Sequence, residues 1–337
     1  MPPPRIALNG LGRIGKLVLR NLIDTGAGGE IVLMNDPMGD PDQHALLMEF
    51  DSVHGRWHTP VAAAQGALVL DGRPIRLTHA QTIEALPLAE MGVDLVIDCT
   101  GVFKTGAKLA PYFAAGVQKL VVSAPIKEEG ALNLVYGINH HLFDGSQKLV
   151  TAASCTTNCL APVAWVLNET FGIERGYMTT IHAYTGDQKL HDNVHKDLRR
   201  ARAGALSMIP TSTGAARAVG LVLPELKGKL DGTAIRVPTA NVSVIDLKFN
   251  AKRKVSAEEI NAAMREAAAG KLKGILGVND EDLVSIDFNH SPYSSVFDLT
   301  QTQVVDGSLV RVMSWYDNEW GFSNRMSDTA VALAATI

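Results

Sequence analysis

The chain has 337 residues, of which 46% are apolar and 20% are charged, and its formal net charge is −4. These values are typical of a soluble globular protein, and the length favours two domains. The negative charge gives no support to a nucleic-acid-binding surface, and no apolar stretch reaches the roughly 20 residues that span a bilayer. The N-terminus lacks the pattern of a secretory signal and only three cysteines are present, so we expect a cytoplasmic protein without a disulfide framework.

A glycine pattern lies near the start of the chain. Residues 5–10 predict a short buried strand, and the apolar periodicity of residues 16–22 predicts a helix. Between them, Gly10 permits a tight turn, Gly12 lets a pyrophosphate approach the backbone, and Gly15 lets the helix pack on the strand. Free N–H groups at the helix start attract the anion. The pattern therefore indicates dinucleotide binding, although alone it is also compatible with an ordinary glycine-rich turn.

An acidic residue follows the next predicted strand. Residues 30–36 form an apolar run that ends in Asp36. Asp36 follows Gly15 by about 20 residues, the usual spacing of the carboxylate that binds the adenosine ribose. A carboxylate there accepts hydrogen bonds from the ribose hydroxyls and repels a 2′-phosphate, so we expect NAD rather than NADP. Alone, Asp36 is also compatible with a turn residue before Pro37, but this interpretation is weaker beside the glycine pattern.

Further strands and helices alternate along the first half of the chain. Apolar runs at residues 93–101 and 120–125 flank a helix-compatible stretch at residues 106–116. This alternation predicts a parallel sheet, and the carboxyl ends of its strands should line the cofactor crevice. Thr100 and Ser123 lie at these ends and are candidate cofactor contacts.

Two of the three cysteines, Cys155 and Cys159, lie in the short stretch Ala-Ser-Cys-Thr-Thr-Asn-Cys. The stretch follows a predicted strand at residues 148–153 and opens a segment with helical spacing. Cys155 therefore falls at a helix N-terminus, where the helix dipole stabilises a thiolate and lowers the cysteine pKa. His182, near the end of a β-like run, is the candidate base.

Other interpretations of the cysteine pair are a disulfide, half of a metal site, or two buried thiols. A disulfide is disfavoured in a cysteine-poor chain from a reducing compartment. A zinc site is disfavoured because the usual ligand spacing and a second ligand pair are missing. Cys159 lies one helical turn after Cys155, and we expect it to point into packing without a chemical role.

Distinct motifs are spread along nearly the whole chain. They lie at residues 9–15, 50–55, 123–125, 153–162, 182–185, 209–216, 236–239 and 314–321. Together they resemble the phosphorylating glyceraldehyde-3-phosphate dehydrogenase family, in its bacterial type. The resemblance implies an α/β fold with a Rossmann-type NAD-binding domain at residues 1–154, completed by a C-terminal helix at residues 319–337. It further implies an α+β catalytic domain with a mostly antiparallel sheet at residues 155–318, and a homotetramer.

The resemblance also implies a role for each candidate site residue. Cys155 resembles the nucleophile and His182 resembles its base. Substrate and phosphate contacts are implied for Ser154, Thr156, Thr185, Arg200, Thr213, Gly214 and Arg236, with Thr185 and Arg236 at the substrate's own phosphate and Thr213 and Gly214 at inorganic phosphate. Cofactor contacts are implied for Arg13, Ile14, Asp36, Ser123 and Asn318, beside Gly10, Gly12, Gly15 and Thr100. No metal site is expected.

The implied reaction uses the cysteine as a covalent catalyst. The thiolate of Cys155 attacks D-glyceraldehyde 3-phosphate, and hydride leaves the hemithioacetal for NAD while His182 takes the hydroxyl proton. Inorganic phosphate then attacks the thioester and releases 1,3-bisphosphoglycerate, a step of glycolysis or gluconeogenesis. Two anion pockets around one cysteine agree with this chemistry.

The chain departs from the family pattern at two places. Asn193 and Val194 stand where many strictly NAD-dependent members carry Leu-Pro, and residues 81–83 (Gln-Thr-Ile) replace the adenine-side motif Arg-Asp-Pro. We therefore expect NAD preference with weak NADP use.

Three alternative functions are weaker. An erythrose-4-phosphate dehydrogenase is disfavoured by the glyceraldehyde-type motif at residues 211–214, and a non-redox cysteine acyl transferase or hydrolase has no need of the glycine pattern. A binding role for a catalytically idle fold finds no support in the negative net charge or in the intact cysteine–histidine pair.

Overall fold

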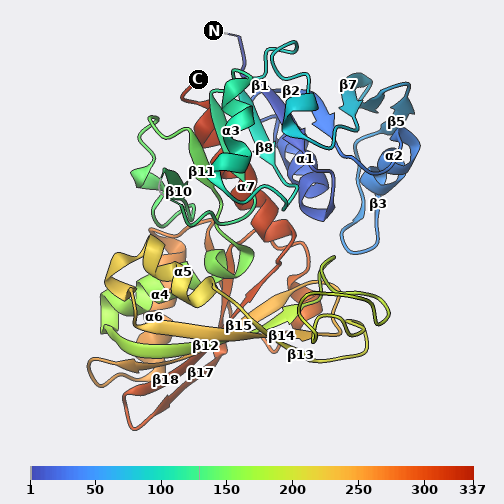
Figure 1. Cartoon of the computed structure of the whole chain (residues 1–337). Helices are drawn as coiled ribbons and strands as arrows, with labels where there is room; N and C mark the ends of the chain where they lie inside the picture. The colour runs from blue at the N-terminus through green and yellow to red at the C-terminus, as the bar shows by residue number, and fades with distance from the viewer. Residues whose placement is uncertain (1, 129) are drawn as a thin grey trace. The chain divides into compact units, whose positions relative to one another are not determined.

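The computed structural model describes residues 2–128 and 130–337 of the chain. Two compact units make up the chain, each with its own large sheet (Figure 1). Unit 1 comprises Met1–Tyr136, His140–Ala153 and Ser323–Ile337, and unit 2 comprises Gly137–Asn139 and Ser154–Phe322. The helices are α1 (Arg13–Thr25), α2 (Pro41–Glu49), α3 (Gly106–Ala114), α4 (Cys155–Phe171), α5 (Ala215–Val222), α6 (Ala257–Ala269) and α7 (Trp320–Ala334).

Unit 1 contains a nine-stranded sheet with the order β10-β11-β9-β8-β1-β2-β7-β6-β5. Its strands are β1 (Arg5–Asn9), β2 (Glu30–Asn35), β5 (Val61–Ala64), β6 (Ala67–Leu70), β7 (Arg73–Thr78), β8 (Leu95–Asp98), β9 (Lys119–Val122), β10 (Ala131–Asn133) and β11 (Leu149–Thr151). A separate two-stranded ribbon pairs β3 (Phe50–Asp51) with β4 (Gly55–Arg56).

The strands from β10 to β7 in this order pair in parallel, which confirms the parallel sheet predicted from alternating strands and helices. Strands β5, β6 and β7 instead form an antiparallel meander at one edge, which was not predicted. Its two turns contain Gly66 and Gly72, both at positive φ, and glycine at such positions is a usual signal of a hairpin.

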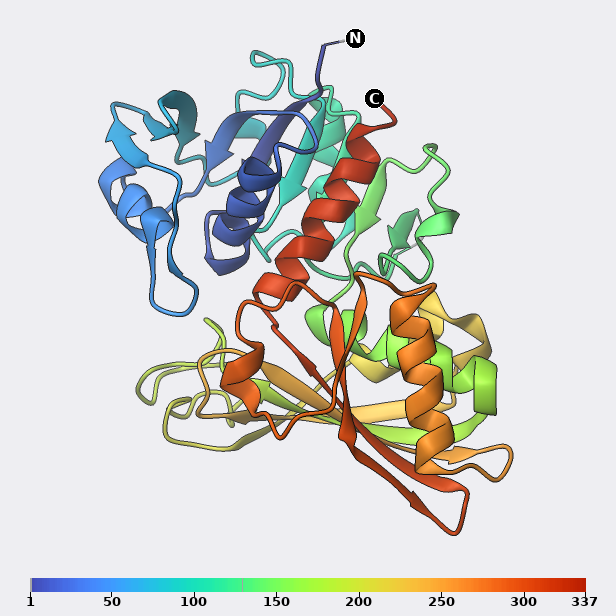
Figure 2. The same cartoon turned by 180° about the vertical axis from the view of Figure 1, so that it is seen from behind.

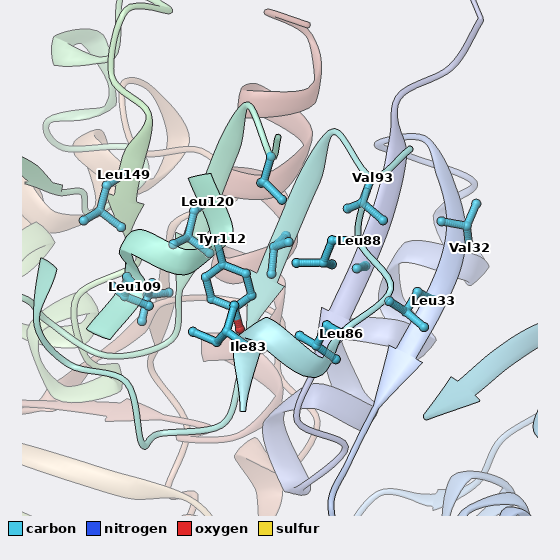
Figure 3. Packing of buried hydrophobic residues seen from close by; sticks show 14 of the residues in the cluster. Val32, Leu33, Ile83, Leu86, Leu88, Val93, Leu109, Tyr112, Leu120 and Leu149 are labelled. Carbon is cyan, nitrogen blue, oxygen red and sulfur yellow. The ribbon is translucent and has the colours of Figure 1, made fainter. Parts of the chain in front are cut away.

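The buried core of unit 1 includes one face of this sheet and the helix that packs on it. Figure 3 shows Leu33 of β2, Leu120 of β9 and Leu109 of α3 converging with side chains from the connection at residues 83–93. Each fully buried side chain of this size stabilises the fold by about 1.5–3 kcal/mol. The parallel strands of this sheet have almost continuously apolar sequences because other segments of unit 1 cover both faces of the sheet.

Unit 2 contains a seven-stranded sheet with the order β13-β14-β12-β15-β18-β17-β16. Its strands are β12 (Ile173–Ala183), β13 (Ile209–Ser212), β14 (Leu230–Val237), β15 (Ser243–Ala251), β16 (Leu276–Asn279), β17 (Ser295–Val305) and β18 (Leu309–Tyr316). The pairs β12–β14 and β16–β17 are parallel and the other neighbours are antiparallel, as expected for a mostly antiparallel sheet. Helices α4, α5 and α6 pack on one face of it (Figures 1 and 2).

The C-terminal helix α7 brings the end of the chain back to unit 1. From Ser323 onward its residues belong to that unit, and Met326, Ala330 and Leu333 are fully buried there. Asn21 of α1 donates a hydrogen bond to Asn324 at 3.1 Å. Figure 2 shows α7, in red, running along unit 1 beside α1. The predicted C-terminal helix that returns to the first domain is therefore confirmed.

None of the helices that the structure describes is long and apolar enough to cross a bilayer.

Candidate active site

The candidate nucleophile lies at the first residue of a helix. Ala153 adopts a left-handed backbone with φ +55°, which is uncommon for a residue with a side chain. Ser154 then caps α4, because its side-chain oxygen accepts a hydrogen bond from the backbone N–H of Thr157 at 3.1 Å. Cys155 therefore stands at the N-terminus of a helix of 17 residues, as its place in the sequence predicted.

The candidate base approaches this cysteine from a neighbouring strand. His182 is the second-last residue of β12, and its Nε2 lies 3.6 Å from Sγ of Cys155. The imidazole is buried, with 4% of its surface exposed. Burial and then the charge of Arg236 lower the pKa of His182 to about 3. The ring is therefore neutral at physiological pH, and a neutral imidazole carries a lone pair on one of its two nitrogens, which general base catalysis requires.

The pKa of Cys155 differs in direction from the sequence-based expectation. Burial raises the pKa of this thiol, whereas the charge of Arg236 and hydrogen bonds from Thr156 act to lower it. In this site burial outweighs the groups that favour the thiolate. The helix N-terminus alone therefore does not produce a low pKa for Cys155.

Arg236 faces the base from the adjacent strand. His182 and Arg236 are register partners in the parallel pair β12–β14, so their side chains lie on the same face of the sheet. Nη1 of Arg236 lies 2.7 Å from Nδ1 of His182 and donates to the carbonyl of Ala183 at 2.9 Å. Its buried Nε has no hydrogen-bond partner among the described residues. A buried, incompletely bonded guanidinium is a ready binding site for an anion.

Tyr316, which the sequence analysis did not single out, connects the nucleophile's helix to the base's strand. Its hydroxyl bonds to Oγ1 of Thr156 at 2.9 Å and to Oγ1 of Thr180 at 2.8 Å. Its ring also meets the imidazole of His182 edge-on, with centroids 5.9 Å apart. The signal that pointed to it was its position in the motif at residues 314–321, just before Asn318.

Two further phosphate-site candidates are bonded to close neighbours in unit 2. Arg200 donates through Nη1 to Asp187 at 2.7 Å and through Nε to Thr211 at 2.9 Å. Thr185 donates through its backbone N–H to the side chain of Gln188 at 2.8 Å. The charge of Arg200 also contributes to the lowered pKa of His182, which indicates that it lies near the catalytic pair.

Thr213 and Gly214 lie at the start of a different helix. Gly214 occupies the N-cap of α5, and Oγ1 of Thr213 accepts from the backbone N–H of Ala215 at 3.2 Å. They follow strand β13, which pairs with β14 and thus connects them to the strand of Arg236. The N–H groups of the first turn of α5 beyond that of Ala215 are suitable donors for an anion.

Cys159 is separated from the chemistry. It is fully buried, and its Sγ contacts Oγ of Ser295 at 3.2 Å and the carbonyl of Ser314 at 3.7 Å. Burial raises its pKa to about 12. The prediction that this thiol points into packing is confirmed. All three cysteines are free.

Unit 1 holds the candidate dinucleotide site. A cavity of about 160 Å³ lies at the carboxyl ends of the parallel strands, and Gly10, Asp36 and Thr100 line it. Gln81 and Thr82 line the same cavity. Three of the predicted cofactor contacts are therefore brought together where an open parallel sheet binds its ligand.

The three glycines of this site differ in what their backbones require. Gly10 has φ +95°, and a Cβ there would lie 2.7 Å from the backbone nitrogen of Thr100. A Cβ on Gly15 would lie 1.8 Å from the carbonyl oxygen of Gly10, so the close approach of α1 to this turn requires glycine. A Cβ on Gly12 would meet nothing within 4 Å, which leaves its backbone accessible to a pyrophosphate. The residues present therefore fit a dinucleotide.

The charged candidates of unit 1 are held by specific partners. Asp36 accepts from the backbone N–H of Leu11 at 2.8 Å and of Met38 at 3.0 Å. Arg13 forms a bidentate ion pair with Asp51 at 2.6 and 3.0 Å. Burial opposes ionisation of Asp51, but hydrogen bonds from Arg13 and from backbone amides outweigh it and lower the pKa to about 2.

Thr100 is fixed by a carboxyl group that sequence reasoning missed. Its backbone N–H and its hydroxyl both donate to Oδ1 of Asp98, at 2.9 and 2.7 Å. Tyr112 donates to Oδ2 of the same residue at 2.8 Å. Asp98 is fully buried, and burial raises its pKa. Its position as the last residue of β8, just before the predicted contact, was the available signal.

The remaining cofactor candidates lie outside the lining of this cavity. Arg13 and Ile14 belong to the first turn of α1, and the backbone N–H of Ser123 donates to the carbonyl of Asp98 at 2.9 Å. Asn318 belongs to unit 2, where it accepts from the hydroxyl of Ser243 at 2.7 Å. The same hydroxyl accepts from the backbone N–H of Ala183, next to His182.

Comparison with known proteins assigns the two halves of the chain to one family. Residues 4–106 match the NAD binding domain of glyceraldehyde 3-phosphate dehydrogenase, and residues 154–318 match its C-terminal domain. The chain is 59% identical over 331 residues to a glyceraldehyde-3-phosphate dehydrogenase of Xanthobacter flavus, 54% over 331 residues to that of Cereibacter sphaeroides, and 52% over 334 residues to that of Pseudomonas aeruginosa. Each alignment covers 98% of both chains.

Proposed function

Because the chain belongs to the glyceraldehyde-3-phosphate dehydrogenase family, we propose that Cys155 and His182 are the nucleophile and base of an NAD-dependent oxidation of glyceraldehyde 3-phosphate. The observation that carries these roles is the 3.6 Å approach of Nε2 of His182 to Sγ of Cys155 at the start of α4. An uncharged imidazole beside a thiol at a helix N-terminus suits covalent catalysis. The product of this family's reaction is the acyl phosphate 1,3-bisphosphoglycerate.

The side chains then act in sequence. His182 takes the thiol proton as Sγ of Cys155 attacks the aldehyde carbon, which gives a hemithioacetal. The imidazolium so formed returns this proton to the alkoxide oxygen of the hemithioacetal. The neutral imidazole then takes the hydroxyl proton as hydride leaves, since an oxyanion expels hydride more readily than a hydroxyl. NAD, when bound, accepts that hydride. The thioester left on Cys155 is attacked by inorganic phosphate, and the acyl phosphate departs as the thiolate leaves.

The reaction needs a site for each of two phosphate groups. We assign the substrate's phosphate to Arg236 and Thr185, and the attacking phosphate to Thr213 and Gly214 with Arg200. The partly unbonded guanidinium of Arg236 supports the first assignment, and the free helix start of α5 supports the second. Ser154 and Thr156 flank the thiol, one as the cap and the other in the first turn of α4.

Cofactor binding is assigned to residues 1–154 with 319–337, and the chemistry to residues 155–318. NAD is the cofactor of the family, and the cavity that Asp36 lines supports NAD over NADP because a carboxylate repels a 2′-phosphate. We also propose that the enzyme uses NADP weakly.

We further propose a homotetramer in the cytoplasm. Between β12 and β13 the chain exposes large apolar side chains, with Val194 92% exposed and Leu198 83% exposed. Such a surface is costly in water unless another subunit covers it. The three free cysteines agree with a reducing compartment. Sedimentation tests the homotetramer, and cell fractionation tests the cytoplasmic location.

A single experiment tests the catalytic assignment. NADH formation is followed spectroscopically with glyceraldehyde 3-phosphate, inorganic phosphate and NAD, for the wild type and for Cys155→Ser. We expect the variant to lose at least about three powers of ten in turnover, because a serine hydroxyl is a far weaker nucleophile. Turnover near the wild-type level would overturn the assignment. Faster oxidation of erythrose 4-phosphate, or acyl transfer without NADH, would instead favour one of the alternative enzymes.

A further inference from the structure

Four buried polar side chains form a continuous hydrogen-bonded row beside the candidate dinucleotide cavity of unit 1. They are Asn35, Asn9 and Asp98, the last residues of the neighbouring parallel strands β2, β1 and β8, together with Tyr112 of α3. Each has at most 4% of its surface exposed. Asn35 bonds to Asn9 at 2.8 Å, Asn9 to Tyr112 at 2.5 Å, and Tyr112 to Asp98 at 2.8 Å. We call these four residues the buried network.

The two ends of the buried network hold two separate segments that line the cavity. At one end, Asn35 donates to the backbone carbonyl of Ala80 at 3.0 Å and accepts from the N–H of the same residue at 2.8 Å. At the other end, Asp98 accepts from the N–H and the hydroxyl of Thr100 at 2.9 and 2.7 Å. Residues 80–82 and residues 100, 102 and 103 line the cavity. The network therefore connects these two walls through side chains.

Backbone groups at one end fix the direction of every hydrogen bond in the network. The N–H of Ala80 can only donate, so Oδ1 of Asn35 is the acceptor and its amide nitrogen donates to Oδ1 of Asn9. Nδ2 of Asn9 then donates to the hydroxyl of Tyr112. The hydroxyl hydrogen of Tyr112 in turn has Oδ2 of Asp98 as its acceptor. All side-chain donors of the network therefore point toward Asp98.

Asp98 receives hydrogen bonds on both of its carboxyl oxygens. Oδ1 accepts twice from Thr100 and Oδ2 accepts from Tyr112, so every hydrogen of the network has an acceptor only when the carboxyl carries no proton. Burial raises the pKa of Asp98, while these hydrogen bonds act to lower it because they favour the charged form. A buried network in which each member is bonded is rigid, and removal of one member leaves its neighbours unpaired.

We propose that Tyr112 and Asp98 are positioning residues for the dinucleotide, because the buried network holds the two cavity walls at the spacing that the adenosine half of the cofactor needs. The proposal rests on the proposed function, which places the dinucleotide in this cavity. The two residues act through Asn9, Asn35 and Thr100, which line the cavity. The ring of Tyr112 lies in the apolar core of unit 1, and this packing fixes the position of its hydroxyl (Figure 3).

A positioning role is separated from a merely structural one by comparing binding with stability. Tyr112→Phe keeps the ring and removes the hydroxyl, which takes this partner from Nδ2 of Asn9 and from Oδ2 of Asp98. Leu109→Val is the matched control, because Leu109 lies on the same helix and in the same core but outside the network. Both variants should melt at a lower temperature than the wild type, and only Tyr112→Phe should bind the dinucleotide more weakly.

Binding is measured by titration calorimetry with NAD and with ADP-ribose, which lacks the nicotinamide ring. For Tyr112→Phe we expect both dissociation constants to rise at least about tenfold, while kcat at saturating NAD stays within about threefold of the wild type. Leu109→Val should bind both compounds as the wild type does. Equal effects of the two substitutions on binding, or no effect of Tyr112→Phe, would overturn the proposal.

The direction of the hydrogen bonds provides a second test, by rescue. Asp98→Asn points an amide N–H at the hydroxyl of Tyr112, which already accepts from Asn9, so the hydroxyl hydrogen loses its acceptor. Adding Asn9→Asp supplies a carboxylate that can accept from both Asn35 and Tyr112, and the net charge returns to that of the wild type. Each hydrogen bond is then restored, with those on either side of the Tyr112 hydroxyl reversed.

We expect Asp98→Asn and Asn9→Asp each to weaken ADP-ribose binding at least about tenfold, and the double variant to bind within about threefold of the wild type. A role that depends on volume and packing alone predicts no such rescue. A double variant that binds ADP-ribose no more tightly than Asp98→Asn would overturn the proposal.

Asp36→Ala distinguishes a failure of this proposal from a failure of the proposed function. Asp36 lines the same cavity and is outside the buried network. If Asp36→Ala weakens ADP-ribose binding and Tyr112→Phe does not, the dinucleotide occupies the cavity and only the role of the network is wrong. If neither substitution changes binding, the placement of the dinucleotide in this cavity is wrong as well.

Discussion

His182 and Arg236 are register partners on the neighbouring parallel strands β12 and β14, and Nη1 of Arg236 lies 2.7 Å from Nδ1 of His182. The sheet thus places the candidate base and the candidate phosphate ligand on one face, in direct contact. Under the proposed function, strand pairing rather than a flexible loop connects substrate recognition to proton transfer.

The buried imidazole makes the stability of the fold depend on pH. The pKa of His182 is about 3 in the folded chain, below the ordinary histidine value of about 6.5, so the unfolded chain binds more protons between these values. The contribution of His182 is complete above pH 6.5 and is lost as the pH falls toward 3. In urea unfolding, His182→Asn should flatten the slope of the unfolding free energy in this window by up to about 1.4 kcal/mol per pH unit.

The control for this measurement is His58→Asn, which removes an exposed histidine from unit 1. Its curve should run parallel to that of the wild type. Parallel curves for His182→Asn and the wild type between pH 6.5 and 4 would contradict the lowered pKa.

The two cysteines of α4 should respond differently to the same substitution. In Cys159→Ser the new hydroxyl can bond to Ser295 and to the carbonyl of Ser314, which already contact the thiol. We expect turnover within about threefold of the wild type and a loss of about 1 kcal/mol in stability. Thermal unfolding and steady-state kinetics measure both quantities. A loss of turnover as large as that of Cys155→Ser would show that Cys159 takes part in the reaction.

Much of the dinucleotide half could be predicted from the sequence because its signals are local. Gly10, Gly12 and Gly15 lie within six consecutive positions, and Asp36 follows at the end of the next strand. The meander at residues 61–78 was missed because its short strands are partly exposed and alternate weakly. Short exposed strands at a sheet edge leave little periodicity to detect.

The catalytic half depends on contacts between distant segments. Cys155 and His182 could be named as a pair from their positions at a helix start and a strand end. The contact of His182 with Arg236, 54 residues away, follows from the strand order of the sheet. The contact of Thr156 with Tyr316, 160 residues away, follows from the packing of α4 on β18. Spacing along the chain does not determine which strands become neighbours, so these contacts could not be predicted.

Tyr316 offers a test of such a distant contact. Tyr316→Phe leaves the buried hydroxyls of Thr156 and Thr180 without this partner, and each lost buried bond costs about 1–3 kcal/mol. We expect lower stability and several-fold slower NADH formation. The reason is that the Tyr316 ring, which packs against His182, is then no longer bonded to the first turn of α4.

Thr180→Val completes a double-mutant cycle with Tyr316→Phe. Because the two side chains share a hydrogen bond of 2.8 Å, the stability losses should fall short of additivity by at least about 0.5 kcal/mol. Strictly additive losses would mean that this bond contributes nothing to the site.

Asp36 provides a test of cofactor choice. Its two carboxylate oxygens accept from the backbone N–H groups of Leu11 and Met38, which hold the carboxylate at the lining of the cavity in unit 1. The fixed negative charge should repel the 2′-phosphate of NADP, so the wild type should show a higher kcat/KM with NAD. Asp36→Asn keeps the shape and removes the charge. We expect the ratio of NAD to NADP efficiency to fall about tenfold, chiefly through better use of NADP.

The matched control for cofactor choice is Asp42→Asn, at an exposed carboxylate in the first turn of α2. It removes the same charge from unit 1 without altering the cavity lining, so its NAD to NADP ratio should equal that of the wild type. An equal shift in both variants would assign the preference to net charge rather than to Asp36. A wild type that uses NADP more efficiently than NAD would contradict the role of this carboxylate, and would direct attention to Asn193 and Val194 instead.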